Sequence, residues 1–491
     1  MELHADGYQP EPALKTLIWF HRWVGISLCC LFAMWFVSGA VMVFVPFPEL
    51  AAKDRAASSE LIDFGRLRIS PNDATIAAGG PTIDRLVSIA GAPAYIAKKA
   101  GGPDLAISGE TGQPLPDVTS DQVAKIAARF AGASIKTVRG PFDYDQWIVY
   151  QGFTHLRPFY KVRIDGAEGI DLYVSARTGE VVQRTRSFER AWNWPGSIVH
   201  WIYFVPIRRV FHLWDRTLWT LGLVGLLTAA AGIWLGIQRT QYKMRSKRPG
   251  VTPYKGLMKW HHVVGLVAGL FVFTWIFSGW LSMDDGRLFS EGTASPGALT
   301  RYQAPVSSGV VAGISTDDLA GLRNASQVTF AQISGNSTAT AIGAGSPKVL
   351  IATSRGPLIL DRIPMPIVEA AVHAAWPGET IQSINSVAPD SAYAKAEYLP
   401  SSAVLLRMVG TSSFGLYVDS LDGKILALVD RNRKIYDWAY YMLHTFNFPG
   451  LSSRPLIRIP IVLSLLMLGF TLSVTSVLVG LRRLGFLSRK V

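Results

Sequence analysis

Four long apolar stretches constrain this 491-residue chain more than any other feature. They begin near residues 16, 210, 259 and 457, and each exceeds the roughly 20 helical residues needed to cross the hydrocarbon core of a bilayer. Two long, more polar stretches separate the first from the second and the third from the fourth. Hydrophobic residues make up 49% of the chain, which is typical of a membrane protein. The sequence therefore predicts a polytopic α-helical membrane protein with four transmembrane helices.

The basic residues predict how these helices are oriented. The formal net charge is +13, but the positive residues crowd the loop at 239–258 and the C-terminal segment from Arg482. Loops rich in Lys and Arg stay on the cytoplasmic side. We therefore expect both termini in the cytoplasm and both polar stretches on the opposite side of the membrane. The excess charge reflects topology, so we expect the lipid bilayer and not nucleic acid as the partner of these segments.

The chain also contains an internal repeat, with no gap inside any matched segment. The first and third apolar stretches match at an offset of 240 residues, and the segments that lead into the second and fourth match at 244. We therefore expect two parallel copies of one unit, each with a span, an extracytoplasmic α+β lobe, an interfacial segment and a returning span. The matched segments are 20–25 with 260–265, 38–39 with 278–279, and 171–179 with 415–423.

These patterns set the expected boundaries along the chain. The predicted parts are a cytoplasmic tail (1–15), span one (16–47), lobe one (48–190), an interfacial segment (191–209), span two (210–238), a basic loop (239–258), span three (259–283), lobe two (284–435), an interfacial segment (436–456), span four (457–481) and a second tail (482–491).

Histidines occupy equivalent positions at the predicted membrane edges. His21 and the neighbours His261 and His262 open spans one and three, while His200 and His444 precede spans two and four at the other edge. Ionisable groups in a membrane are costly and usually functional. His212 lies 12 residues beyond His200, which is about 18 Å if one helix carries both.

Haem iron suits such histidines, because a b-type haem needs one or two imidazoles from packed helices. His21 and His261 each have a glycine four residues later, Gly25 and Gly265, and bare backbone at that position lets a flat group lie close to the helix. Basic side chains are candidates to pair with the haem propionates. The candidates are Arg22, Arg208 and Arg209.

Two competing metal sites fit the sequence less well. Zinc prefers carboxylate or cysteine ligands at short spacing, as in His-Glu-x-x-His, and the sequence has no such motif. A covalent c-type haem requires Cys-x-x-Cys-His, whereas the only cysteines are the adjacent Cys29 and Cys30. The sequence therefore favours haem b, with two groups per chain.

These motifs together resemble the PepSY-associated transmembrane proteins of bacterial inner membranes. The resemblance rests on His-Arg-Trp-x-Gly at 21–25 with its preceding Phe20, on Trp-His-His-x-x-Gly at 260–265, on Leu-His-Thr at 443–445 and on the Leu-Tyr-Val strands of the lobes. It covers about residues 15–485 and implies PepSY-like lobes. It also implies haem b bound by His21, His200, His261 and His444, with His262 and His212 as further candidates.

The resemblance implies a function, which competes with two others. Members of the family are expected to include siderophore-iron reductases, which take electrons from quinol or another cytoplasmic donor and reduce a ferric siderophore or other Fe(III) chelate in the periplasm. The alternative is a non-enzymatic PepSY module that binds or restrains an exported protein. A transporter with a histidine proton relay ranks last, because the spans contain almost no mid-membrane Asp, Glu or Lys.

Overall fold

The computed structural model describes residues 12–80, 82–99, 101–245, 250–284, 286–303, 313–343, 345–353 and 355–487. The chain divides into two units, which we treat separately. The membrane unit combines 1–46, 192–289 and 435–491, and the lobe unit combines 47–191 and 290–434.

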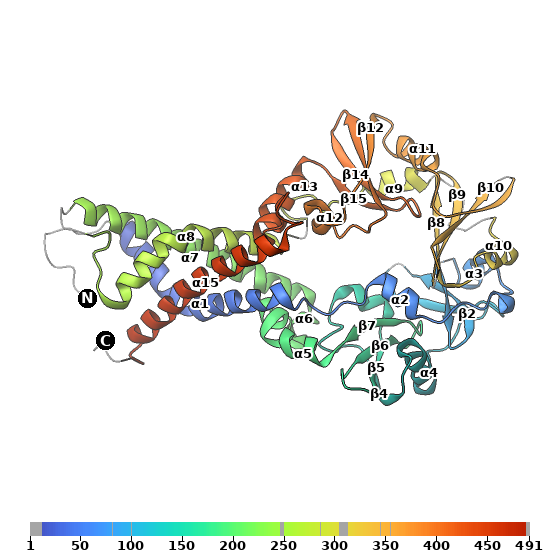
Figure 1. The fold of residues 1–491 in the computed structure, drawn as a ribbon, viewed down its shortest axis with the longest axis horizontal. Helices are drawn as coiled ribbons and strands as arrows, with labels where there is room; N and C mark the ends of the chain where they lie inside the picture. The colour runs from blue at the N-terminus through green and yellow to red at the C-terminus, as the bar shows by residue number, and fades with distance from the viewer. Residues whose placement is uncertain are drawn as a thin grey trace. The chain divides into compact units, whose positions relative to one another are not determined.

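Four long helices build the membrane unit (Figure 1). By length and composition, each can cross a membrane, which confirms the four predicted spans. An apolar environment offers no partner for backbone polar groups, so a single crossing segment must satisfy them within a helix. The four helices are α1 (Pro12–Phe44), α7 (Phe211–Arg245), α8 (Gly256–Leu281) and α15 (Pro455–Arg483).

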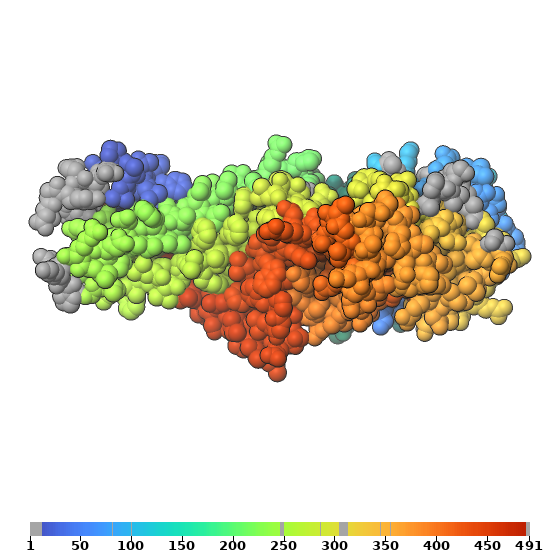
Figure 2. All heavy atoms as spheres, turned by 90° about the horizontal axis from the view of Figure 1, so that it is seen from above, coloured from blue at the N-terminus to red at the C-terminus, as the bar shows by residue number. Residues whose placement is uncertain are grey.

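Each of these helices packs against two others. The packed pairs are α1 with α15, α7 with α8, α1 with α7 and α8 with α15. The atoms of α7 and α8, green to yellow-green, meet along one face of this unit in Figure 2. Exchanging α1 with α8 and α7 with α15 reproduces the same set of contacts. The bundle core includes Phe36, Val272, Trp275 and Leu466.

Short helices precede α7 and α15 in the same order. A short α-helix is followed in each case by a π-helical segment and then by a histidine. The first of these segments is kinked at Gly196, whose backbone angles are not helical. The elements are α5 (Ser187–Asn193), η3 (Trp194–Ile198), α6 (Val205–Arg208), α13 (Arg431–Tyr436), η4 (Asp437–Met442) and α14 (Leu443–Thr445).

Three antiparallel sheets form the framework of the lobe unit. One has seven strands in the order β11-β10-β9-β8-β1-β2-β3, and two have four strands, β4-β5-β6-β7 and β12-β13-β14-β15. The strands are β1 (Thr82–Ile89), β2 (Ala92–Lys98), β3 (Leu105–Ser108), β4 (Ile135–Phe142), β5 (Phe159–Ile164), β6 (Asp171–Ser175), β7 (Val181–Thr185), β8 (Ala325–Ile333), β9 (Asn336–Gly343), β10 (Lys348–Thr353), β11 (Gly356–Leu360), β12 (Glu379–Ser386), β13 (Ala403–Gly410), β14 (Phe414–Asp419) and β15 (Ile425–Val429).

Short helices accompany the sheets. In α4 (Ser120–Ala131), Thr119 forms a capping box with Gln122, while the buried Val123 and Ala127 face the core beneath β5. The others are α2 (Ala52–Ser58), η1 (Phe64–Arg66), α3 (Pro71–Ala77), η2 (Gln151–Leu156), α9 (Pro296–Gln303), α10 (Thr316–Ala320), α11 (Met365–Ala375) and α12 (Ala392–Ala396).

The seven-stranded sheet joins the two halves of the chain. Strands β1 and β8 pair antiparallel with Leu86 opposite Val328, and the two strands come from different halves of the chain. One hydrophobic core includes residues from both sides of this junction, Ile83 and Leu350 among them. The sequence divides this region into two lobes at 48–190 and 284–435. The structure shows that those two stretches share one sheet. The sequence could not predict this, because a long-range strand pairing leaves no signal in the local pattern.

A buried ion-pair network lies beside this junction, and it carries our first prediction. Arg85 is buried on β1, and its Nη2 lies 2.6 Å from Glu180 and 3.3 Å from Asp104. Arg85→Ala leaves both buried carboxylates without that partner, so we expect unfolding to become easier by about 3–5 kcal/mol. Denaturant unfolding of the full chain measures the loss. Arg66, which is exposed and pairs with Glu110, is the control, and Arg66→Ala should cost less than about 1 kcal/mol.

The pH dependence of this loss follows from Glu180. Burial alone would raise the pKa of its carboxyl, but the charge of Arg85 and its hydrogen bond outweigh burial and lower the pKa below the ordinary 4.5. A lowered carboxyl pKa stabilises the fold above the unfolded-state value and ceases to do so as the pH falls through the folded-state value. The difference between wild type and Arg85→Ala should therefore shrink below about pH 4.5. An unchanged difference there would contradict this assignment.

Two histidine pairs as a candidate cofactor site

The histidines at one end of the bundle come from the starts of α1 and α8. His21 and His261 face each other with ring centroids 6.4 Å apart and an angle of 35° between the rings. The α7–α8 connection lies at this end of the bundle, so we call these two residues the loop-side pair. The sequence left His261 and His262 open as partners of His21, and the structure places the ring of His261 opposite His21.

The histidines at the other end follow the two π-helical segments. His200 and His444 face each other with ring centroids 6.3 Å apart and an angle of 60° between the rings. The chain leaves α1 for the lobe unit at this end, so we call these two residues the lobe-side pair. Both pairs therefore join residues that correspond in the two halves.

Hydrogen bonds fix the lobe-side rings. Nδ1 of His200 lies 2.9 Å from Oγ of Ser38, which donates its single hydrogen to the carbonyl of Met34 at 2.7 Å. Nδ1 of His444 lies 3.0 Å from Oγ of Ser278, which likewise donates to a backbone carbonyl. With that hydrogen on the carbonyl, each serine oxygen accepts from an Nδ1–H. The network assigns both rings the tautomer with an unprotonated Nε2.

The loop-side rings reach the same tautomer with different partners. Nδ1 of His21 lies 3.0 Å from the carbonyl oxygen of Thr228, which can only accept. Nδ1 of His261 lies 3.3 Å from the hydroxyls of both Thr475 and Ser476, and these donate to the carbonyl of Leu472. All four paired rings thus present an Nε2 lone pair, the form that ligates metals.

His262 adopts the opposite arrangement. Its Nε2 lies 3.0 Å from the carbonyl oxygen of Gly236, so Nε2 carries the hydrogen, and its ring packs edge-on against Tyr254 with centroids 5.4 Å apart. Adjacent residues on a helix project about 100° apart, and His262 consequently faces α7 while His261 faces His21. Because its ring contacts Gly236 and Tyr254 and not His21, His262 is disfavoured as the partner of His21.

His212 does not join the lobe-side pair. It is exposed on the first turn of α7, where its ring packs against Phe211 with centroids 5.8 Å apart. His200 and His212 do not share one helix, because the chain turns at Ile202, whose φ is 50°, before α6 begins. The distance of about 18 Å expected for a continuous helix therefore does not apply.

Glycines allow three of the paired rings to approach a helix backbone. A Cβ atom at Gly232 would lie 2.6 Å from Cε1 of His21, and one at Gly279 would lie 3.1 Å from Cε1 of His444. At Gly39 the corresponding distance to His200 is 3.7 Å. These glycines lie on helices facing the histidines. Gly25 and Gly265 were predicted to make room for a flat group, and a Cβ atom at either would contact other side chains only at ordinary distances. Arg22, a candidate partner of the propionates, is exposed.

Sequence reasoning missed the residues that orient the rings. Trp35 Nε1 donates to the carbonyl of His200 at 3.0 Å, and Trp275 Nε1 donates to the carbonyl of Leu443 at 3.2 Å. Both tryptophans and both serines correspond at the offset of 240, so the signal for these positions was present in the repeat. Gly232 has no such signal, because Ser476 occupies its place in the second half.

The two pairs lie far apart along the bundle. His21 and Ser38 are separated by 17 residues on α1, and Ser38 contacts His200, so the separation along this helix is about 26 Å. The same 17 residues separate His261 from Ser278 on α8. The interval is apolar and includes Phe36 and Trp275, whose ring centroids are 6.0 Å apart.

No group of three or more His, Cys, Asp or Glu side chains able to hold a metal ion occurs among the described residues. Two opposed imidazoles fit a different kind of centre. With nitrogen–metal bonds of about 2 Å and each ring centre about 1 Å behind its nitrogen, two axial ligands have centroids about 6 Å apart. Both pairs match this spacing. The residues present therefore fit a macrocyclic metal cofactor that supplies the remaining ligands itself.

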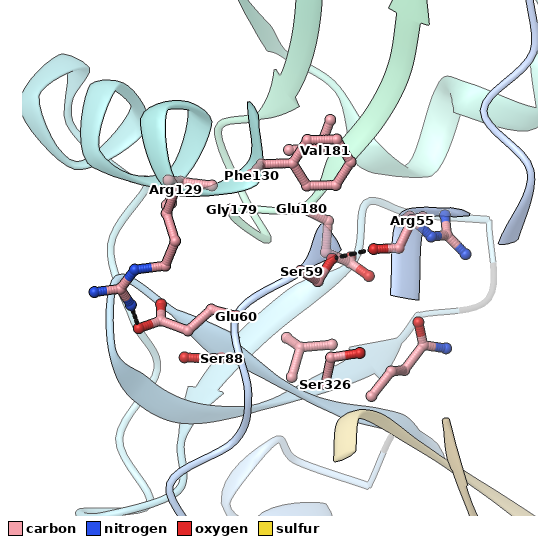
Figure 3. A pocket seen from close by; sticks show the side chains of 13 residues that line it. Arg55, Ser59, Glu60, Ser88, Arg129, Phe130, Gly179, Glu180, Val181 and Ser326 are labelled. Atoms are coloured by element: carbon pink, nitrogen blue, oxygen red, sulfur yellow. Dashed lines mark hydrogen bonds and ion pairs between the residues drawn. The ribbon is translucent and has the colours of Figure 1, made fainter. Parts of the chain in front are cut away.

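The lobe unit contains a small polar cavity (Figure 3). Its volume is about 40 Å³, which suits a few waters rather than a chelate. Polar groups of the wall bond to one another, since Arg129 pairs with Glu60 and the Ser59 hydroxyl donates to the carbonyl of Arg55. We assign this cavity no role in binding.

Four membrane-crossing helices and paired histidines at both ends of the bundle define a multi-pass membrane protein with a candidate cofactor site. The family model described as the PepSY-associated TM region matches residues 18–483. The chain therefore belongs to the PepSY-associated transmembrane family. No curated protein matches it.

Proposed function

We propose that the chain is a haem b oxidoreductase that moves electrons across the bacterial inner membrane to a ferric chelate on the lobe side. The observation that carries this proposal is the opposition of two imidazole pairs, each with its Nδ1–H engaged and its Nε2 lone pair available. Haem b would supply a one-electron centre at each pair. The metal ligands, their orientation and the exclusion of water must come from residues of this chain.

These residues supply ligands, orientation and the exclusion of water. The four histidines offer uncharged nitrogen ligands, and the bonds to Nδ1 fix the rotation of each ring. In the apolar interval around Phe36 and Trp275, α1 has no Asp, Glu, Lys, Arg or His at 23–37, and α8 has none at 263–277. That interval disfavours a proton relay through the bundle and suits a pathway for electrons alone.

The proposed orientation places the loop-side pair at the cytoplasmic surface, where quinol or another donor would deliver electrons. The basic loop between α7 and α8 supports this orientation. The lobes would then lie in the periplasm, where the chelate, such as a ferric siderophore, would be reduced.

The serines provide a test of the ligand assignment. Ser38→Ala and Ser278→Ala each remove the acceptor of an Nδ1–H, and losing such a partner typically costs 10–100-fold in affinity for the metal centre. Titration of purified apoprotein with haem should therefore show weaker binding at the lobe-side pair only. Ser27→Ala is the matched control, because Ser27 is exposed on the same helix and bonds its own backbone at Trp23. Equal affinities for all three variants and wild type would contradict the role of Nδ1.

The reductase proposal has its own experiment. Purified protein, reduced with dithionite in liposomes and freed of excess reductant, should be reoxidised on addition of a ferric chelate, with a stoichiometric yield of Fe(II). A protein that binds haem yet is not reoxidised by any ferric chelate would refute the reductase activity. If the lobes alone account for function in cells, the membrane histidines will be dispensable, as expected of a PepSY binding module.

A further inference from the structure

Arg208 is a buried cation that forms no ion pair with any carboxylate in the described parts of the chain. It ends α6, is only 2% exposed, and its guanidinium carbon lies 4.2 Å from the ring centroid of Trp214. Tyr203 and Phe211 also face it, at 4.9 and 5.2 Å. Its Nη2 reaches the Tyr203 hydroxyl at 3.4 Å, whereas its Nε and Nη1 have no hydrogen-bond partner in the parts of the chain that the structure describes.

In the second half, an arginine, Arg458, occupies the place of Trp214. Trp214 donates its indole N–H to the carbonyl of Trp201 at 2.8 Å, and Arg458 donates Nη1–H to the carbonyl of Thr445 at 2.8 Å. Residue numbers 214 and 458 correspond, as do 201 and 445, at the offset of 244. Each accepting residue directly follows a histidine of the lobe-side pair. The Nε of Arg458 is also buried without a partner among the described residues.

Positive charge therefore collects next to the lobe-side pair. Burying an unpaired guanidinium is costly, and aromatic faces offset only part of that cost. Asp215, the acidic residue nearest in sequence, pairs with Arg287, and Asp284, which follows α8, accepts from backbone N–H groups. A planar guanidinium with two free N–H donors matches a carboxylate or phosphate oxyanion.

We propose that Arg208, assisted by Arg458, binds the carboxylates of the macrocycle held by His200 and His444. This assignment rests on the proposed function. It selects Arg208 from the three arginines considered in the sequence and adds Arg458, which the sequence did not single out. An anionic lipid headgroup has the same oxyanion chemistry, and the experiment separates the two sources.

The experiment compares haem b with its dimethyl ester, in which both carboxylates are blocked. The parent protein carries His261→Ala, so that binding reports on the lobe-side pair, and is held in nanodiscs of zwitterionic lipid. We expect the parent to bind the acid at least about tenfold more tightly than the ester. Arg208→Gln should weaken acid binding about tenfold and abolish the preference. Arg216→Gln, which removes an exposed charge on α7, should preserve it.

Arg208→Lys provides a second variant, which retains the charge but not the planar donor pair. Its affinity for the acid should lie between those of the parent and Arg208→Gln. Folding is checked in the otherwise wild-type chain, where Arg208→Gln should still bind haem at the loop-side pair. An acid preference unchanged by Arg208→Gln would overturn the proposal. The proposal would also be overturned if Arg208→Gln left haem binding unchanged and lowered only the retention of anionic lipid in phosphatidylglycerol nanodiscs. A parent and wild type that bind no haem would instead refute the proposed function.

Discussion

Replacing His200 or His444 by alanine is expected to lower the haem content from about two per chain to about one. Each substitution removes one of two opposed ligands at the lobe-side pair and leaves His21 and His261 unchanged. Because the pairs lie at opposite ends of α1 and α8, their losses should be independent. His21→Ala should leave the lobe-side centre, and a double variant of His21 and His444 should be colourless. Haem counted against protein after purification measures these losses.

The same experiment discriminates among the histidines. His262→Ala and His212→Ala should retain both haems, since Nε2 of His262 donates to Gly236 and His212 lies apart on α7. His373→Ala, on the exposed face of α11 in the lobe unit, controls for the loss of any histidine. Retention of both haems in His444→Ala would contradict the ligand assignment.

Gly232→Ala is expected to abolish binding at the loop-side pair. The added Cβ would lie 2.6 Å from Cε1 of His21, with Nδ1 and Nε2 of that ring at 3.2 and 3.4 Å. The clash is with the body of the ring, so the imidazole must rotate away and lose its bond to the carbonyl of Thr228. We expect haem content to fall to about one per chain, with the remaining haem at the lobe-side pair.

Gly480→Ala is the matched control for this substitution. Gly480 also lies within a membrane helix, but a Cβ there would meet Ile26 only at 3.6 Å, an ordinary contact. Both variants should be equally helical and monodisperse, so that a difference in haem content reflects the position of His21. Full occupancy of both centres in Gly232→Ala would show that the ring adopts another position when the cofactor binds.

Much of this arrangement was predictable because duplication repeats the chemistry at fixed offsets. The spans followed from length and apolarity, and the histidines that pair are those that correspond in the two halves. The match of Ser38 with Ser278 was visible too, but its meaning was not, since a serine in a helix usually bonds its own backbone. Only the structure shows that both hydroxyls also accept from a histidine on another segment.

The choice between His261 and His262 could not be made from sequence. Span three is apolar on every face, so no amphipathic pattern indicates which side faces the bundle. The shared sheet escaped prediction for a related reason. The pairing of Leu86 with Val328 connects residues more than 200 positions apart, and neither strand differs locally from one that pairs within its own half.

The most direct test of the central claim is an optical spectrum of the detergent-purified protein, oxidised and then dithionite-reduced, with a pyridine haemochrome count. The account predicts sharp reduced α and β bands and about two haems b per chain, as expected for two bis-histidine centres. A protein that is colourless as purified and remains so after haem is added would contradict it.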